Sequence, residues 1–311
     1  MNKKTLCLGV FVARNSKIKI NLKTPMDFFH RIGFALAFSP TSEALLAETA
    51  WLTNLFHAEL ILIHVGPSGQ KEEQLAHYLL ERVGLSGKEV KIIWEQGSPA
   101  ERILKVCQRE KIDLLVAGAL NRENLVKYYI GTIARKIMRK ADCSLMMITN
   151  PSAQHQPIKN VVVNAEDSPY VEEALAAACR LGKAGDHAWI HIVREIKLYG
   201  LAMAATSQHS EEEYSDIKQQ LLRDEIDHVD KMLSKIPHDD VKLNVKMLSG
   251  KSGFELCKFA QRKQADWLVV GAPARRFKLF DRVFPHDLEY VFADLPCNLL
   301  IVHPRKEGHR G

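Results

Sequence analysis

The stretch Asp-Leu-Leu-Val-Ala-Gly-Ala at residues 113–119 returns in the second half of the chain as Asp-Trp-Leu-Val-Val-Gly-Ala at residues 266–272. Each copy is a short apolar run that ends in glycine, which is typical of a strand buried on both faces of a parallel sheet. Gln-Arg precedes both copies, and a cysteine, Cys143 or Cys297, follows each before another apolar run. A repeat of about 150 residues is a duplicated domain, because solenoid repeats are far shorter.

The same alternation of strand and helix patterns surrounds both copies. In the first half we expect strands at 31–38, 60–65, 90–94, 114–117 and 145–148, and helices at 41–56, 71–83, 99–110 and from Thr132. In the second half we expect strands at 161–163, 189–193, 241–247, 266–272 and 299–302, and helices at 172–181, 211–234 and after Ser252. This order predicts two consecutive doubly wound, Rossmann-like parallel-sheet domains, at 30–152 and 157–304. Residues 1–29 are predicted to be an unpacked N-terminal extension and residues 305–311 a tail.

Composition limits the class of protein. Hydrophobic residues make up 46% of the chain of 311 residues and charged residues 26%, as in globular domains. No apolar stretch approaches the ~20 residues of a membrane-spanning helix. The six cysteines form no C-x-x-C pair, which favours reduced, buried thiols and a cytoplasmic location. The net charge of +6 comes from dispersed Lys and Arg, so we expect neither a nucleic-acid nor a membrane partner.

Two short segments have the pattern of a helix start. Ser98 and Glu101 flank Pro99 as a capping box, and Ser252 and Glu255 repeat that spacing in the second half. Gly250-Lys251-Ser252 also has the ending of a phosphate-binding P-loop, but position 245 is Val where that motif needs Gly. We therefore interpret this segment as a helix cap.

The loop after the strand at 114–117 is the first candidate site. In open α/β sheets ligands bind beyond the carboxyl ends of the strands, where glycines and a helix N-terminus can hold a phosphate. This loop runs from Gly118 through Asn121 to Gly131 and Thr132, where a helix begins. Gly131 permits close backbone approach, and Thr132 supplies a hydroxyl and an N–H, so an anion could bind here. The alternative is that the glycines only make a tight connection.

At these residues the chain resembles the universal stress protein family, whose ATP-binding members carry G-x2-G-x9-G-[ST] in this loop. Gly118, Asn121, Gly131 and Thr132 occupy the motif, with Asn121 in place of its second glycine. The resemblance extends to residues 97–101 and to Ile63-His64-Val65, and covers about 30–150 and 157–303. It implies that the first domain binds ATP, or AMP or ADP, with Mg²⁺ bridging the phosphates.

The resemblance also has departures. ATP-binding relatives have an acid at the end of the first strand, where this chain has Ala37; with Val65, this is the expected adenosine side. In the second domain Glu166 restores an acid, but the loop after Gly271 lacks the later glycines and the Ser/Thr. We expect the second domain not to be an ATP site.

Several other residues have a plain structural interpretation beside a functional one. His64 and His191 fall at what we take to be equivalent strand ends, where structural histidines are commoner than ligands. Arg135, Lys136, Arg139 and Lys140, and in the second domain Arg275, Arg276 and Lys278, are more typical of solvated faces than of phosphate sites. Burial is favoured over redox sensing for Cys143 and Cys297. No hydrolase, zinc-protease or dinucleotide motif is present.

Three functions remain open. The first is a stress-response regulator that binds an adenine nucleotide in its first domain, and the second is a tandem scaffold that works through protein partners. A nucleotide-hydrolysing enzyme is the third, and the absence of a recognisable base or metal-binding carboxylate beside the loop disfavours it. The resemblance further implies that the strands at 145–148 and 299–302 pair antiparallel across an internal pseudo-two-fold axis, which allows a monomer and does not exclude a homodimer.

Overall fold

The computed structural model describes residues 29–85, 90–121, 128–129, 131–166, 170–185, 188–195, 211–238, 241–249, 253–272, 291 and 295–303. Most of the predicted N-terminal extension and the tail at 305–311 lie outside these residues. Phe29, assigned to the extension from sequence, is buried and packs edge-on against Phe56 with ring centroids 4.9 Å apart. The packed structure therefore begins earlier than predicted, because Phe29 fills the core beside the first helix.

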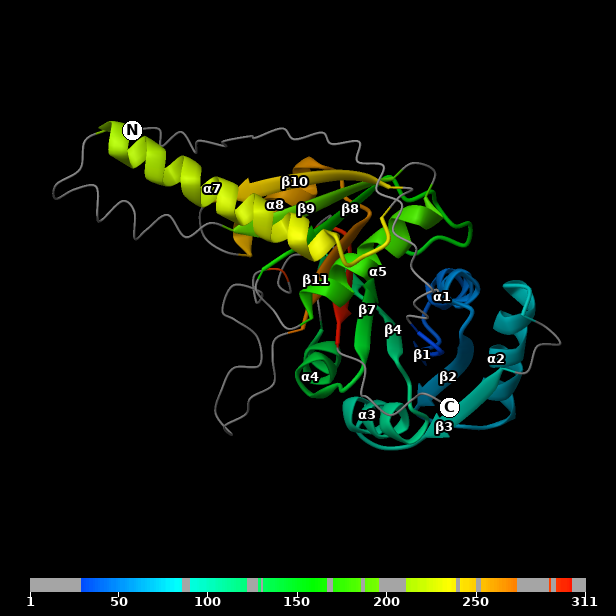
Figure 1. Cartoon of the computed structure of the whole chain (residues 1–311). Coiled ribbons are helices and arrows are strands. Elements are labelled where there is room, and N and C mark those ends of the chain that lie inside the picture. The colour runs from blue at the N-terminus through cyan, green and yellow to red at the C-terminus, as the bar shows by residue number, and fades with distance from the viewer. Residues whose placement is uncertain are drawn as a thin grey trace.

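The first half contains the nine elements predicted from its pattern and a short additional ribbon (Figure 1). They are β1 (Arg31–Leu36), α1 (Ser42–Phe56), β2 (Glu59–Val65), α2 (Gln70–Arg82), β3 (Lys91–Glu95), α3 (Pro99–Arg109), β4 (Leu114–Gly118), α4 (Thr132–Lys140) and β7 (Ser144–Ile148), with β5 (Leu120–Asn121) and β6 (Tyr128–Tyr129) between β4 and α4.

The second half repeats this order. Its described elements are β8 (Asn160–Asn164), α5 (Val171–Ala184), β9 (Trp189–Glu195), α7 (Glu211–Leu233), β10 (Lys242–Leu248), α8 (Phe254–Arg262), β11 (Trp267–Gly271) and β12 (Asn298–Val302). Both halves are therefore α/β units with the same strand and helix sequence.

One ten-stranded sheet joins the halves, in the order β10-β9-β8-β11-β12-β7-β4-β1-β2-β3. Every neighbouring pair is parallel except β7 and β12, which run antiparallel with Met146 opposite Leu300. The prediction of two doubly wound sheets joined by their last strands is confirmed. In each half the chain reverses its direction of strand addition between the first and fourth strands, β1 and β4 or β8 and β11, which is where such sheets bind ligands.

Helices cover both faces of the sheet. Apolar residues of α1, α2, α5 and α7 pack on one face, and those of α3, α4 and α8 pack on the other. Side chains alternate between the two faces along each strand, so Leu114 and Val116 of β4 belong to the first layer and Leu115 to the second. This double burial explains why the strands are continuous apolar runs in the sequence.

The repeated Asp113 and Asp266 hold equivalent strand starts. Asp113 Oδ2 accepts hydrogen bonds from the backbone N–H groups of His30 and Arg31, at 2.8 and 2.9 Å. Asp266 Oδ2 accepts from those of Lys159 and Asn160, at 2.7 and 2.8 Å. The two domains can therefore be aligned residue by residue, with Arg31 equivalent to Asn160.

Two reciprocal hydrogen bonds reinforce the junction of the domains. Asn298 Oδ1, at the start of β12, accepts from the backbone N–H and the hydroxyl of Thr149, just beyond β7, at 2.9 and 3.1 Å. Ser144 Oγ, at the start of β7, accepts from the N–H of His303, just beyond β12, at 3.0 Å. Each central strand is thus bonded at both ends to the other.

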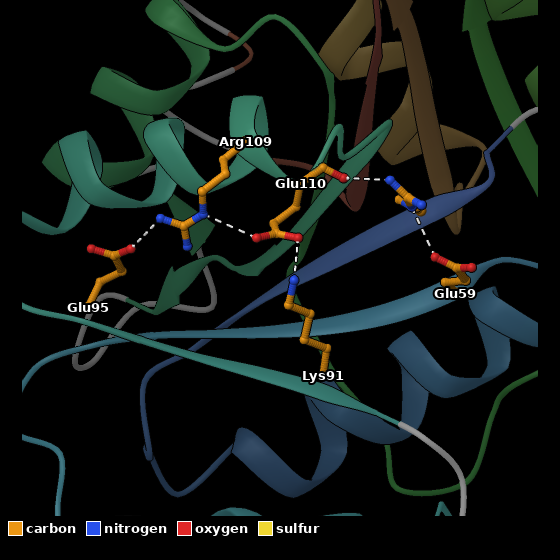
Figure 2. Close-up of polar contacts among 6 residues, drawn as sticks. Glu59, Lys91, Glu95, Arg109 and Glu110 are labelled. Atoms are coloured by element: carbon orange, nitrogen blue, oxygen red, sulfur yellow. Dashed lines mark hydrogen bonds and ion pairs between the residues drawn. The ribbon is translucent and has the colours of Figure 1, made fainter.

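Charged side chains link the strands of the first domain to α3 (Figure 2). Glu110 binds Lys91 at 2.6 Å and Arg109 at 3.1 Å, and Arg109 also binds Glu95 at 3.0 Å. Lys91 and Arg109 together hold the pKa of the Glu110 carboxyl below its usual range, with the hydrogen bond from Lys91 as the larger cause. The main-chain oxygen of Glu110 extends the network by accepting a hydrogen bond from Arg31.

The capping boxes were predicted wrongly in their bonding. Ser98 is the N-cap of α3, as expected, but its side chain makes no cap hydrogen bond, and Glu101 instead binds Lys136 of α4 at 2.7 Å. The N-cap of α8 is Gly253, at φ 71°, one residue after the predicted Ser252. In α3 a tertiary ion pair takes the carboxylate that the local motif would have used.

Candidate functional site

The predicted site residues outside the loop meet at the carboxyl edge of the first domain. Leu36 pairs with His64 in the register of β1 and β2, so Ala37 and Val65 are the next residues along each strand direction. Phe34 pairs with Val116 of β4, which brings Gly118 level with Leu36. Ala37, Val65 and Gly118 therefore lie on three neighbouring strands at the reversal point of the sheet.

Small side chains line this edge on the face covered by α3 and α4. Ala35, Ala117 and Ala119 are partly buried against that layer, together with Ala134 of α4. Ala37 is exposed. These alanines give the edge an accessible apolar surface on which a flat, uncharged group could rest.

Gly118 has a packing role of its own. A Cβ placed on it would come within 2.8 Å of Leu45 Cδ1 in α1. It therefore faces α1, on the side of the sheet opposite to Ala117 and Ala119. A side chain at position 118 would push α1 outward.

The loop predicted between Gly118 and Gly131 contains a short antiparallel ribbon. Asn121 of β5 pairs with Tyr128 of β6, and Leu120 pairs with Tyr129. Asn121 thus has strand backbone and does not use the left-handed conformation that its place in the motif suggested. Residues 122–127 and 130 lie outside the described part of the chain.

Gly131 and Thr132 begin α4 as predicted. Gly131 is its N-cap, buried, with φ −66° and ψ 169°, while Thr132 is exposed. No side chain caps this terminus and no acid lies in the first turn. The first-turn N–H groups therefore carry the positive end of the helix dipole without a neutralising carboxylate from α4 itself.

The basic cluster on α4 is a mostly solvated face, as interpreted from sequence. Arg139 and Lys140 are exposed, and Lys136 is paired with Glu101. Lys136 holds the pKa of Glu101 below its usual range through their hydrogen bond and charge, and Lys140 contributes less. The second basic cluster, at 275–278, lies outside the described residues.

His64 is buried at the same edge within a group of aromatic rings. Its Nδ1 donates to the main-chain oxygen of Leu36 at 3.0 Å, while Nε2 is buried without a hydrogen-bond partner. The rings of Phe38 and Trp94 lie 4.7 and 5.4 Å from it. Phe38 has φ 48°, an unusual conformation for a bulky residue, and nothing in the sequence indicated it.

The predicted equivalence of His64 and His191 is wrong. The sheet register makes Arg194, at the end of β9, the counterpart of His64, because Arg194 Nη1 donates to Ala165 O at 2.8 Å as His64 does to Leu36 O. Arg194 is buried and paired with Glu225 of α7. The two domains have thus exchanged His for Arg at this position, which a match by residue type cannot reveal.

His191 is a structural histidine. Asn244 Nδ2 donates to its Nδ1 at 3.1 Å, so Nε2 carries the proton and donates to Asn160 Oδ1 at 3.2 Å. Burial, with a smaller contribution from the charge of Lys263, lowers the pKa of His191 to about 4. The ring is therefore neutral at physiological pH.

The described cysteines are free and buried, which confirms that interpretation for Cys143 and Cys297. Burial raises the pKa of Cys179 to about 12 and also raises that of Cys297. In the part of the chain that the structure describes, no group of three or more His, Cys, Asp or Glu is arranged to hold a metal ion. None of the described helices is both long and apolar enough to span a membrane.

Comparison with known proteins gives a consistent result. The model of the universal stress protein family matches residues 28–149 and again residues 157–303. A universal stress protein of Methanocaldococcus jannaschii is 27% identical over 112 residues, which are 35% of this chain and 59% of that protein. The chain thus matches little more than half the length of this relative.

Two solved structures share the whole architecture. A functionally unknown protein from Pseudomonas aeruginosa has a TM-score of 0.65 at 15% identity, covering 90% of this chain and 94% of its own. A universal stress protein from Archaeoglobus fulgidus has a TM-score of 0.61 at 13% identity, covering 88% and 98%. At these identities the likeness concerns the tandem fold.

Proposed function

The chain belongs to the universal stress protein family, and from that premise we propose that it is a stress-response regulator whose first domain binds an adenine nucleotide, with ATP as the working ligand. The observation that carries the proposal is the combination, at one sheet edge, of accessible alanines and an uncapped helix N-terminus. The alanines suit a base and sugar, and the first turn of α4 suits phosphate.

Each residue of the proposed site has a defined part. Ala37 and Val65 would contact the adenosine side, while the backbone at Gly131 and Thr132 would bind the phosphates. Gly118 would keep β4 close to α1, and Asn121 would hold the loop in its ribbon. Mg²⁺ would enter with ATP, held mainly by phosphate oxygens and water, because the described residues near the loop offer no cluster of ligating side chains.

Calorimetric titration of the full chain with Mg-ATP tests this proposal. We expect micromolar binding to the unaltered protein and none to Gly131→Glu, whose carboxylate would meet the phosphates at the helix N-terminus. Gly131→Ala is the matched control: φ −66° suits any residue, so this variant should fold normally and lose at most about tenfold in affinity. No binding to the unaltered protein would refute the proposal.

A tandem scaffold without nucleotide is the second candidate. Ala37 favours it, because this exposed position carries no acid to contact a nucleotide. Under this alternative the chain would still work through its two-domain surface, with protein partners in place of ATP. The absence of heat with Mg-ATP, AMP and ADP would support it.

A further inference from the structure

The second domain has an unpaired buried atom at its own carboxyl edge. Asn164 is the last residue of β8, and its Oδ1 is buried without a hydrogen-bond partner. In the sheet register Asn164 lies between Val193 of β9 and Val270 of β11, both buried. An amide oxygen thus lies among apolar groups at the point where the second domain reverses its strand order.

Comparison with the first domain shows that the fold does not need this amide. The alignment set by Asp113 and Asp266 makes Ala35 the counterpart of Asn164, and Ala37 the counterpart of Glu166. An alanine therefore suffices to build the strand end at this position. The second domain has polar groups where the first has apolar ones.

The same strand shows that this domain satisfies amides that serve its structure. Asn160, four residues earlier on β8, accepts a hydrogen bond from His191, and Asn244 donates to the same ring. Leaving a buried carbonyl oxygen unsatisfied costs about 1–3 kcal/mol. A cost of this kind at a strand end is typical of a binding position rather than of a structural one.

We propose that the second domain has its own small-molecule site at the carboxyl end of β8, where Asn164 Oδ1 accepts a hydrogen bond from an N–H or O–H group of an uncharged nucleoside. Asn164 as a whole is only partly buried, and rotation about its soft terminal torsion can turn the oxygen toward a ligand. The valine walls suit a flat base. The nearby carboxylate of Glu166 accepts hydroxyl hydrogens and disfavours phosphate.

This site is independent of the nucleotide site proposed for the first domain. The test therefore uses the full chain carrying Gly131→Glu, titrated calorimetrically with adenosine and with AMP. We expect adenosine to bind to one site and AMP at least tenfold more weakly. Adding Asn164→Ala, which copies Ala35, should weaken adenosine binding at least tenfold.

Thermal unfolding without ligand separates this role from a structural one. Asn164→Ala should leave Tm unchanged or raise it, because it removes an unsatisfied buried atom. Asn160→Ala, the matched control on the same strand, should lower Tm because it breaks a bond to His191. The proposal is overturned if adenosine does not bind to Gly131→Glu, if Asn164→Ala binds it equally well, or if Asn164→Ala lowers Tm as Asn160→Ala does.

Discussion

Single residues carry much of the difference between the two domains. His64 and Arg194 occupy one position and both donate to the end of the first strand of their domain, yet only Arg194 has a charged partner from a helix. Ala35 and Asn164 are another such pair. The duplicated fold keeps the backbone interaction and lets the side chain change, so the two carboxyl edges can hold different ligands.

His191 should make the protein sensitive to mild acid. Its pKa is about 4 in the folded chain, against 6.5 for an ordinary solvated histidine, so the unfolded chain gains a proton first as pH falls. The stability from its neutral form is present above pH 6.5 and is lost progressively toward pH 4, by on the order of 3 kcal/mol. Urea unfolding between pH 7 and pH 4 should show a shallower loss in His191→Gln.

An exposed histidine provides the control for that measurement. His77 lies on the outer face of α2, and His77→Gln should reproduce the pH dependence of the unaltered chain. An unchanged slope in His191→Gln would show that other groups cause the acid sensitivity.

The site residues were predictable from sequence only in part. The spacing of the loop motif located Gly131 and Thr132 at the start of a helix, because a helix N-terminus has a local signature. The conformation of Phe38, the ribbon that contains Asn121 and the unpaired oxygen of Asn164 were not predictable, because each depends on residues distant in the sequence.

At the scale of elements, the positions of strands and helices followed the sequence pattern to within a few residues. Continuous apolar runs such as 114–118 can only be strands covered on both faces, so the pattern determined them. Contacts between elements were less predictable. Glu101 had the spacing of a capping box but binds Lys136 of a different helix, and local spacing contains no information about that partner.

The aspartates at the starts of β4 and β11 should stabilise their domains similarly. Asp113→Ala removes an acceptor from two backbone N–H groups of the neighbouring strand, and Asp266→Ala does the same in the second domain. Because these bonds involve a carboxylate and are partly exposed, we expect each variant to lose about 2–3 kcal/mol of unfolding free energy. Denaturant unfolding checks this, and a loss in only one domain would contradict the equivalence.

The long helix α7 is attached to the sheet mainly by its C-terminal half. Val229, Met232 and Leu233 are buried, whereas the N-terminal half extends past the strands in Figure 1 and exposes Ile217. Glu225, near the middle, pairs with the buried Arg194. Glu225→Gln should therefore speed hydrogen exchange in α7 more than in α5, because it weakens a partly buried charge pair. Equal protection of α7 in variant and unaltered chain would contradict this.

At the scale of the whole molecule, the antiparallel pair β7 and β12 makes two domains into one sheet. The sequence repeat indicated two units, but the pairing of their last strands came from family resemblance rather than from any residue pattern. The bonds of Ser144 and Asn298 show how the junction is built, with each strand start capping the end of the other strand. Linker residue His155 adds a contact by stacking on Trp51 of α1, with ring centroids 3.7 Å apart.

A continuous sheet should make the two domains unfold together. Each domain has two tryptophans, Trp51 and Trp94 in the first and Trp189 and Trp267 in the second, so replacing one pair by Phe leaves fluorescence that reports the other domain. We expect denaturant midpoints from the two reporters to move together when Asp266→Ala is added, although Asp266 lies only in the second domain. The junction transmits the loss, because opening β12 exposes the edge of β7. If the first-domain midpoint stayed fixed while the second fell, the domains would be independent units, and a ligand bound in one could not stabilise the other.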